Sequence, residues 1–302
     1  MRLLILGGSG FVSGALVAMA LERGHEVWAL TRGERALQAG VHPIRADRND
    51  EKQLSAALEA AGKTYDAALD CICYNKEQAQ TDLSVLTNYT RRLIVISTDS
   101  VYHPDCKVIG QDETVEGYMA DGSYGHKKRE MEEVFLEDGG RRADFTLFRP
   151  GHIFGPGSEL GCFPEHTRQQ DLLAHIRAGK TIRLVGGGEY LIHPIYAGDL
   201  ARVMLDSIDN ENTFNQVFCI GGPDVVKNRD YYELLGRIMH VPVQIETVAE
   251  AGYLEAHPQY SGHLCHRSYN LNKLKNTGIP LPGTTLEEGL QKQVEDLLSK
   301  GR

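Results

Sequence analysis

The stretch RLLILGGSGFVSGALV, residues 2–17, joins an apolar run to a glycine-rich turn and then to a segment with helical character. Such a turn between a strand and a helix can hold a dinucleotide pyrophosphate, because N–H groups of the helix N-terminus face the phosphates. The spacing is Gly7-x-x-Gly10-x-x-Ser13, with Gly14 one residue later. We therefore predict a nucleotide-binding turn at this point. The residues expected to contact the cofactor here are Gly7, Ser9, Gly10, Phe11 and Val12.

Outward from this turn, short apolar runs alternate with helical patterns through the first half of the chain. Runs rich in β-branched residues and bounded by Gly, Asp or Asn are typical of strands, and their alternation with helices is typical of a parallel sheet. Strands are predicted at 2–6, 26–30, 42–46, 66–72, 92–98 and 145–150, and helices at 51–62, at 77–89 and from Tyr124. The predicted fold class is α/β, a Rossmann-type doubly wound parallel sheet.

After Pro150 the composition changes, and residues 151–166 are rich enough in Gly and Pro to predict an irregular loop. Further elements are predicted as a helix at 168–178, a strand at 181–185, a helix from Ala197, a strand at 216–222 and a capped helix at 285–300. We expect a smaller, mainly C-terminal substrate lobe beside the sheet. The expected division is residues 1–150 and about 181–221 for the NAD(P)-binding domain, and about 151–180 and 222–302 for the substrate-binding lobe.

Composition narrows the class of partner. The chain has 302 residues and a formal net charge of −9, which argues against a general nucleic-acid or anionic-membrane binder. No apolar run approaches the length of a membrane span, and the N-terminus lacks the pattern of a signal peptide. The six cysteines are scattered, without zinc-site spacing. We therefore predict a cytoplasmic protein with a small-molecule substrate, with free thiols and without a metal.

The end of the second predicted strand bears on the choice between NAD and NADP. An NAD site normally places a carboxylate about 20 residues beyond the glycines. This position is occupied by Leu30, Thr31 and Arg32, so the acid is missing and an arginine is present. A charge-assisted contact from Arg32 to an anionic 2′-phosphate is worth roughly 1.5–3 kcal/mol. NADP is favoured over NAD, and a solvated surface position for Arg32 is the competing interpretation.

A hydroxyl, a tyrosine and a lysine follow one another in an order that suits proton transfer. Thr98 ends the strand at 92–98, and Tyr124 and Lys128 are i and i+4 on the next helix, hence on one face. A phenol with a pKa near 10 is a weak acid or base at neutral pH. A nearby ammonium favours the phenolate. We therefore predict that Tyr124 transfers a proton and that Lys128 lowers its pKa.

With these motifs the chain resembles an extended short-chain dehydrogenase/reductase of the NAD(P)-dependent epimerase/dehydratase family. The matching segments are GGSGFVSG (7–14), RADRND (45–50), STDSVY (97–102), SYGHKK (123–128), FRPGHIFGPG (148–157), HPIYAGDLA (193–201) and TLEEGLQKQV (285–294). The resemblance implies that Thr98, Tyr124 and Lys128 form the catalytic set, that Lys128 also holds the nicotinamide ribose, and that Asp47 contacts the adenine. It further implies cofactor contacts from Arg48, Cys71, Ile72 and Cys73, and a homodimer formed through the helices near 77–89 and 124–137.

Asp99 is a fourth catalytic candidate. STDSVY resembles the STDEVY of sugar-nucleotide 4,6-dehydratases, in which an acidic pair follows the threonine and eliminates water. This chain keeps Asp99, but Ser100 replaces the glutamate, which argues against dehydration. Two interpretations of Asp99 stay open: an acid or base, and a cap of the loop.

Two histidines stand where relatives bind substrate. Many nucleotide-sugar enzymes of the family carry an Arg-Asp pair where this chain has Ile192 and His193, and an asparagine where it has His152. His152 and His193 are candidate substrate ligands, and packed neutral histidines are the alternative. Arg168, Arg183, Arg229 and Arg267 are candidates for phosphate contacts.

Three functions compete. We expect hydride transfer at a secondary alcohol or ketone of a sugar or nucleotide sugar, preferably epimerisation through a transient ketone. The first alternative is an NADPH-dependent carbonyl reductase of a non-nucleotide substrate. The second is a non-enzymatic nucleotide- or RNA-binding protein, as some plastid relatives are, although those have lost the Tyr–Lys pair that this chain keeps.

Overall fold

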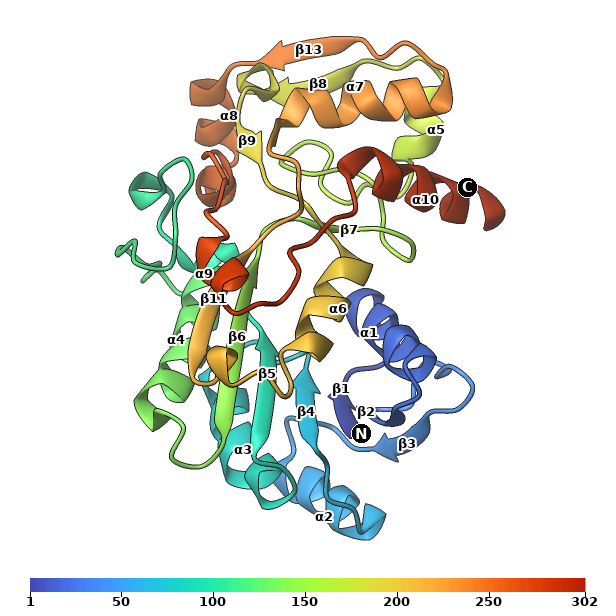
Figure 1. The fold of residues 1–302 in the computed structure, drawn as a ribbon. Coiled ribbons are helices and arrows are strands. Elements are labelled where there is room, and N and C mark those ends of the chain that lie inside the picture. The colour runs from blue at the N-terminus through green and yellow to red at the C-terminus, as the bar shows by residue number, and fades with distance from the viewer. Residues whose placement is uncertain (302) are drawn as a thin grey trace.

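A parallel sheet forms the centre of the larger lobe in the computed structural model, which describes residues 1–301 (Figure 1). Seven strands of the described chain line up in the order β11-β6-β5-β4-β1-β2-β3, each parallel to its neighbours. The strands are β1 (Arg2–Leu6), β2 (Glu26–Thr31), β3 (His42–Arg45), β4 (Ala67–Asp70), β5 (Arg92–Ile96), β6 (Asp144–Pro150) and β11 (Gln216–Ile220). The strand order reverses between β1 and β4, and open sheets of this kind bind ligands at the carboxyl ends beside that point. This confirms the predicted fold class.

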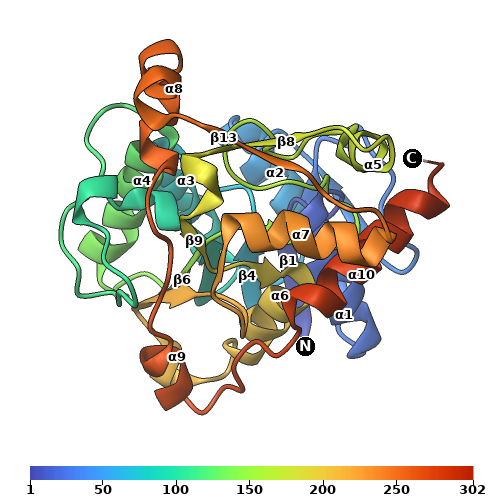
Figure 2. The ribbon, with the colours of Figure 1, turned by 90° about the horizontal axis from the view of Figure 1, so that it is seen from above.

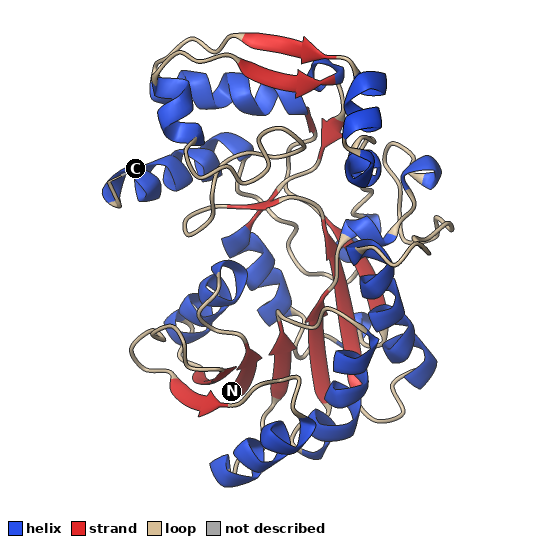
Figure 3. Ribbon diagram, turned by 180° about the vertical axis from the view of Figure 1, so that it is seen from behind, coloured by secondary structure: helices blue, strands red, loops and turns tan. Residues whose placement is uncertain are grey.

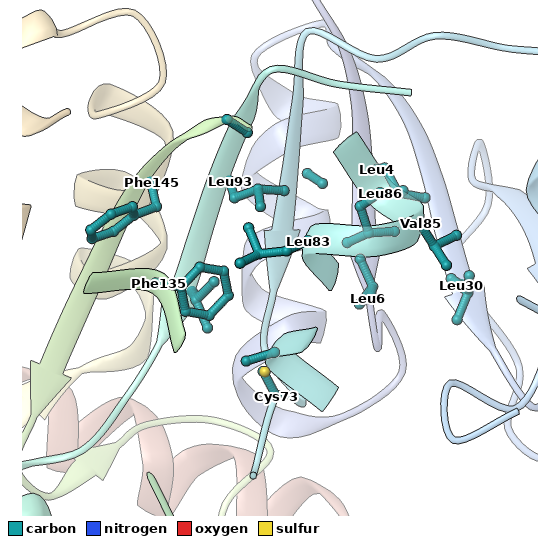
Figure 4. Packing of buried hydrophobic residues seen from close by; sticks show 14 of the residues in the cluster. Leu4, Leu6, Leu30, Cys73, Leu83, Val85, Leu86, Leu93, Phe135 and Phe145 are labelled. Atoms are coloured by element: carbon teal, nitrogen blue, oxygen red, sulfur yellow. The ribbon is translucent and has the colours of Figure 1, made fainter. Parts of the chain in front are cut away.

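Helices cover both faces of the sheet (Figures 1 and 3). On one face lie α1 (Phe11–Glu22) and α6 (Ala197–Asp206), and on the other lie α2 (Glu51–Ala61), α3 (Lys76–Val85) and α4 (Tyr124–Asp138). The two-residue period of β1 serves both layers: Leu3 and Ile5 pack toward α1, whereas Leu4 and Leu6 pack on the side of α2 and α3. Figure 4 shows the second layer, in which Leu83 lies near Leu93. None of the helices in the described part of the chain has the length and apolarity that crossing a membrane requires.

Figure 1 shows a smaller lobe above the sheet. This lobe has an apolar core of its own. Its elements are α5 (Leu172–Arg177), β8 (Ile182–Val185), β9 (Leu191–Ile192), β12 (Val226–Lys227), α7 (Asn228–Met239), β13 (Ile245–Val248), α8 (Glu250–Ala256) and α10 (Leu286–Ser299). Figure 2 shows α7 and α10 side by side. β7 (Ile153–Phe154) pairs with β10 (Ile195–Tyr196) between the lobes, and α9 (Asn272–Asn276) returns to the edge of the sheet at β11.

One strand differs from its predicted place. Residues 181–185 are predicted to belong to the NAD(P)-binding domain. Instead, β8 pairs in parallel with β13, and Ile182 and Leu184 belong to the core of the smaller lobe. An apolar run of this length predicts a strand without specifying its partner, so the sequence could not assign it. The rest of the predicted division into domains stays a prediction.

A buried ion pair ties α4 to the sheet. Arg149 at the end of β6 donates to both carboxylate oxygens of Glu132 on α4, from Nε at 2.8 Å and from Nη2 at 2.6 Å. Both side chains are almost fully buried, and Ser97 donates a further hydrogen bond of 2.6 Å to Glu132 Oε1. Because α4 carries Tyr124 and Lys128, this pair positions the predicted catalytic helix.

Replacing Arg149 by methionine should lower the free energy of unfolding by about 3–5 kcal/mol, because it leaves the Glu132 carboxylate buried without its cation. Urea unfolding followed by circular dichroism measures the change. Arg183→Met is the control, since Arg183 is half exposed in its ion pairs and such a change stays within about 1 kcal/mol. Equal stability of the two variants would contradict a positioning role for the buried pair.

Candidate active site

The glycine turn forms at the carboxyl end of β1 for steric reasons. Gly7 and Gly8 have φ values of 111° and 93°, and a Cβ on Gly8 would come within 2.8 Å of the Ala29 side chain. Gly10 caps α1, and its N–H donates to Ser13 Oγ at 3.1 Å. The serine at the position of a third glycine therefore fits the turn by capping it. The turn therefore ends at the N-terminus of α1, and the N-terminus of a helix offers N–H groups to a pyrophosphate.

A cavity of about 400 Å³ runs from this turn along the carboxyl ends of β1, β2 and β4. It fits an adenine dinucleotide, since it combines the glycine turn with polar groups at the ends of two further strands. Its lining includes seven of the predicted cofactor residues: Gly7, Ser9, Gly10, Arg32, Asp47, Arg48 and Ile72. Phe11 lines an adjoining hollow, and Val12 and Cys71 line the next cavity along the sheet.

The side chains of two predicted cofactor residues are engaged inside the protein, although Arg48 also lines the cavity. The guanidinium of Arg48 pairs with the buried carboxylates of Asp70 and Asp82, the latter at 2.9 Å. The Cys73 side chain belongs to the hydrophobic core, and burial raises the pKa of its thiol. Contacts of these two side chains with the cofactor are therefore not supported, because burial commits them elsewhere. The side-chain ligand atoms of Asp70, Cys73 and Asp82 lie within 4.8 Å of one another, and Arg48 supplies the positive charge between the two carboxylates.

A second cavity, of about 440 Å³, contains the predicted catalytic and substrate residues. Its lining includes Thr98, Asp99, Tyr124, Lys128, His152 and His193. Tyr74 lines both this cavity and the first one, so the two adjoin. The structure thus brings these six predicted residues together from four separate segments of the sequence.

Tyr124 is the first residue of α4, which Ser123 caps by accepting a hydrogen bond from the His126 N–H at 3.3 Å. Desolvation raises the pKa of Tyr124 to about 12, and a hydrogen bond with Thr98 acts in the opposite direction. The pKa shift is opposite to the one expected from the lysine. Tyr124 keeps 53% of its surface exposed, and a phenol is protonated at neutral pH with or without this shift.

Lys128 lies one helical turn further on and is almost completely buried. Its ammonium donates to the carbonyl oxygens of Cys73 at 2.6 Å and Ile96 at 2.7 Å, at the carboxyl ends of β4 and β5. Burial lowers the pKa of this lysine. Two carbonyl contacts fix the ammonium beside the cavity that Tyr124 also lines, and the catalytic roles of both residues stay predictions.

Asp99 is a buried carboxylate with three cationic or hydroxyl partners from other segments. Arg267 Nη1 lies 2.8 Å and 2.7 Å from its two oxygens, Lys107 Nζ lies 3.4 Å from Oδ2, and the Tyr269 hydroxyl donates to Oδ2. Although burial raises its pKa, Arg267 and Lys107 outweigh this effect and hold the pKa well below the usual range. A permanently ionised and saturated carboxylate is a poor acid or base. The geometry therefore favours a positioning role for Asp99.

The two candidate histidines differ in their bonding. Both ring nitrogens of His193 are engaged: Nδ1 accepts from the Tyr269 N–H at 3.1 Å, and Nε2 lies 2.8 Å from the Gly222 carbonyl oxygen. His193 is thus a neutral, packed histidine, and its role as a substrate ligand is not supported. His152 lines the cavity, and burial lowers its pKa to about 3, so its imidazole is neutral as well.

The four candidate arginines separate into two groups. Arg183 and Arg229 form ion pairs on the surface, with Glu165 and Glu189 respectively, whereas Arg168 and Arg267 line the cavity. Lys107 and Tyr269 were not predicted at all. The sequence offers no signal for them, because both lie in irregular segments and reach Asp99 only through tertiary contacts.

These features define a Rossmann-type dinucleotide-binding protein with the residue set of an oxidoreductase-type enzyme. The model of the NAD dependent epimerase/dehydratase family matches residues 3–221, and the chain belongs to this family.

Among curated proteins, the chain is similar to a dTDP-4-dehydro-6-deoxy-D-allose reductase of a Streptomyces species, with 24% identity over 79% of this chain and 80% of the relative. It is also similar to the chloroplast stem-loop binding protein of 41 kDa b of Arabidopsis thaliana, with 22% identity over 74% of this chain and 60% of that protein. Among solved structures, the UDP-glucose 4-epimerase of Thermotoga maritima with UDP-glucose matches with a TM-score of 0.82 and 20% identity over the full length of both chains. This last likeness shows the shared fold.

Replacing Asp99 by asparagine should lower the free energy of unfolding at pH 7 by about 3–5 kcal/mol, because Arg267 and Lys107 then stay buried without their anion. The low pKa of Asp99 makes its contribution complete above the unfolded-state value near 4 and lost as the pH falls below it. The difference between wild type and variant should therefore shrink below about pH 4. Urea unfolding between pH 3 and 7 measures it, with the surface variant Glu189→Gln as control; a pH-independent difference would contradict the assignment.

Proposed function

We propose that the protein catalyses hydride transfer at a secondary alcohol or ketone of a sugar or nucleotide sugar, with Tyr124 as the proton-transferring residue. One observation carries this proposal: the Tyr124 hydroxyl, its partner Thr98 and the Lys128 helix turn meet in a cavity that adjoins the dinucleotide cavity through Tyr74. The relatives named above as a reductase and an epimerase act on nucleotide sugars according to their names, which supports the substrate class.

In this proposal, Tyr124, Thr98 and Lys128 act on the substrate oxygen and the cofactor. When bound, the nicotinamide gives or takes the hydride. Tyr124 donates its proton to the substrate oxygen as a ketone is reduced and takes it back in the oxidative direction, and Thr98 shares a hydrogen bond with the same oxygen. Lys128 lies at the carboxyl ends of β4 and β5, where it would meet the nicotinamide ribose and stabilise a transient phenolate.

Epimerisation through a transient ketone is the preferred form of this reaction. Dehydration is disfavoured, because Ser100 stands in the place of a base and Asp99 is held by Arg267. Net reduction by NADPH is the second candidate. It is favoured by the reductase names of several relatives. A reductase consumes one NADPH for each product, whereas an epimerase recycles its bound cofactor.

Tyr124→Phe should reduce turnover at least about 100-fold, because the variant lacks the general acid, while the dissociation constant of the cofactor stays nearly unchanged. Turnover is followed with UDP-glucose, UDP-galactose and dTDP-4-keto-6-deoxyglucose, by chromatography of the sugar nucleotides and by NADPH absorbance. Tyr89→Phe is the matched control, since Tyr89 lies at the opposite end of β5 from Thr98. Variant activity above a tenth of wild type would refute the role of Tyr124. Absence of wild-type turnover on all three, together with RNA binding, would favour the non-enzymatic alternative.

We also propose NADP as the preferred cofactor. At the end of β2, Arg32 and Arg35 line the dinucleotide cavity. The pair between Arg32 and Glu34 spans 3.0 Å, but both side chains are 64% exposed, so it competes weakly with a phosphate. Arg32 and Arg35 are therefore the cations available to a 2′-phosphate, and Arg32 is the one directly after β2.

The wild-type protein should bind NADP more tightly than NAD in a calorimetric titration. Arg32→Ala should weaken NADP binding by about tenfold or more, because a charge-assisted contact is lost, and leave NAD binding unchanged. Arg237→Ala, on α7 of the smaller lobe, serves as the control. Tighter binding of NAD by the wild type would overturn this assignment.

A further inference from the structure

Arg168 is an exposed cation that lines the cavity of Tyr124. Its guanidinium contacts the Ile153 carbonyl oxygen at 3.5 Å and lies 5.9 Å from the centre of the Phe11 ring. Among the described residues no carboxylate forms an ion pair with it. The cavity it lines also holds Tyr124 and His152. An unpaired arginine beside reacting groups is suited to a ligand that brings its own negative charge.

The chain holds Arg168 in place before any ligand arrives. The backbone N–H of Arg168 donates to the Gly161 carbonyl oxygen at 3.2 Å, and this bond closes the loop of residues 161–168. The Tyr231 hydroxyl on α7 accepts from the Gly161 N–H at 2.9 Å, and Tyr232 bonds the backbone of Cys162. A Cβ on Gly161 would come within 1.7 Å of a backbone oxygen, so the closed loop requires glycine there. The loop is therefore anchored to the smaller lobe.

Arg267, the other arginine of this cavity, is already committed. It forms two contacts of 2.7–2.8 Å with Asp99 and a third, of 3.0 Å, with the Gly262 carbonyl oxygen. The charged residues that line the cavity are Asp99, Lys128, Arg168 and Arg267. Asp99 is the one anion among them, and it is neutralised by Arg267. The cavity is positive on a chain whose net charge is −9. Since two carbonyl oxygens engage the Lys128 ammonium, the charge left for an anionic ligand is that of Arg168.

The cofactor diphosphate is a less suitable partner for Arg168 than the substrate. Of the three adjoining cavities, the two that contain the glycine turn are lined by Arg35, and one of them by Arg32 as well. Arg168 lines neither of these two cavities. Its charge instead acts on the pKa of Tyr124 and of His152, for which desolvation is the larger influence. Arg168 is therefore close to the atoms that react.

We propose that Arg168 is the specificity-determining residue that binds an anionic oxygen group of the substrate, a phosphate ester or a carboxylate, and so orients the substrate toward Tyr124. This inference rests on the proposed function, since it takes the cavity of Tyr124 as the substrate site. Many nucleotide-sugar enzymes of the family carry an arginine where this chain has Ile192 and His193. In this proposal Arg168, from a different segment, takes the role of that arginine.

The test measures binding without turnover. Protein saturated with NADP⁺ is titrated in a calorimeter with uridine diphosphate, as the phosphate probe, and with D-glucuronate, as the carboxylate probe. The variants are Arg168→Gln and Arg168→Lys, with Arg183→Gln as the matched control from the surface of the same lobe. We expect the wild type to bind one probe, Arg168→Gln to bind it about tenfold or more weakly, and Arg168→Lys to fall between, because lysine keeps the charge but loses the planar fork. The control should match the wild type.

The probe that binds distinguishes a phosphate-bearing substrate from a carboxylate-bearing one. Equal affinity of wild type and Arg168→Gln for that probe, or binding of neither probe by the wild type, would overturn the proposal. A tenfold loss of NADP⁺ affinity in Arg168→Gln would also overturn it and assign the arginine to the cofactor diphosphate. Failure of Tyr124→Phe to lose turnover would refute the proposed reaction and leave these binding results unaffected, so the two proposals can fail separately.

Discussion

The architecture of the site depends on two hydrogen bonds that the buried Lys128 ammonium donates. Its bonds to the Cys73 and Ile96 carbonyl oxygens join α4 to the carboxyl ends of two neighbouring strands. Parallel strands end at the same edge of a sheet, so one buried cation can reach both. Tyr124, one turn earlier on the same helix, is thereby held in the cavity that Thr98 lines after β5. The Glu132–Arg149 pair secures the same helix to β6, so α4 is fixed on three strands at once.

A second set of contacts completes the site from the end of the chain. Asp99 follows β5, yet its partners Lys107, Arg267 and Tyr269 come from a loop and from the segment before α9. A buried carboxylate without partners would lower the stability of the fold. The contacts of Asp99 with Arg267 and Tyr269 therefore help to hold the C-terminal segment at the sheet edge. Because its three partners engage Asp99, Tyr124 is the residue that we propose for proton transfer.

The predictions succeeded where a local pattern has one geometric meaning. The strand, glycine turn and helix at the start of the chain define their own site, and the i, i+4 spacing puts Tyr124 and Lys128 on one face whatever surrounds them. A local pattern does not decide between two possible environments of a side chain. Arg48 follows a strand that borders the dinucleotide cavity, but two buried aspartates attract its side chain inward. His193 lies in a motif typical of substrate contacts, but Gly222 and Tyr269 occupy both of its ring nitrogens.

The sequence by itself therefore determined the parallel α/β sheet, the cofactor turn and the hydroxyl–Tyr–Lys order, because periodicity, glycine sterics and helical spacing act over a few residues. Only the tertiary structure decided which charged side chains form ion pairs with carboxylates and which do not. Arg168, Arg183, Arg229 and Arg267 are equivalent candidates in the sequence, yet three find carboxylates and Arg168 does not among the residues described. An ion pair is made between segments far apart in the chain, and its partner is set by packing that no local pattern encodes.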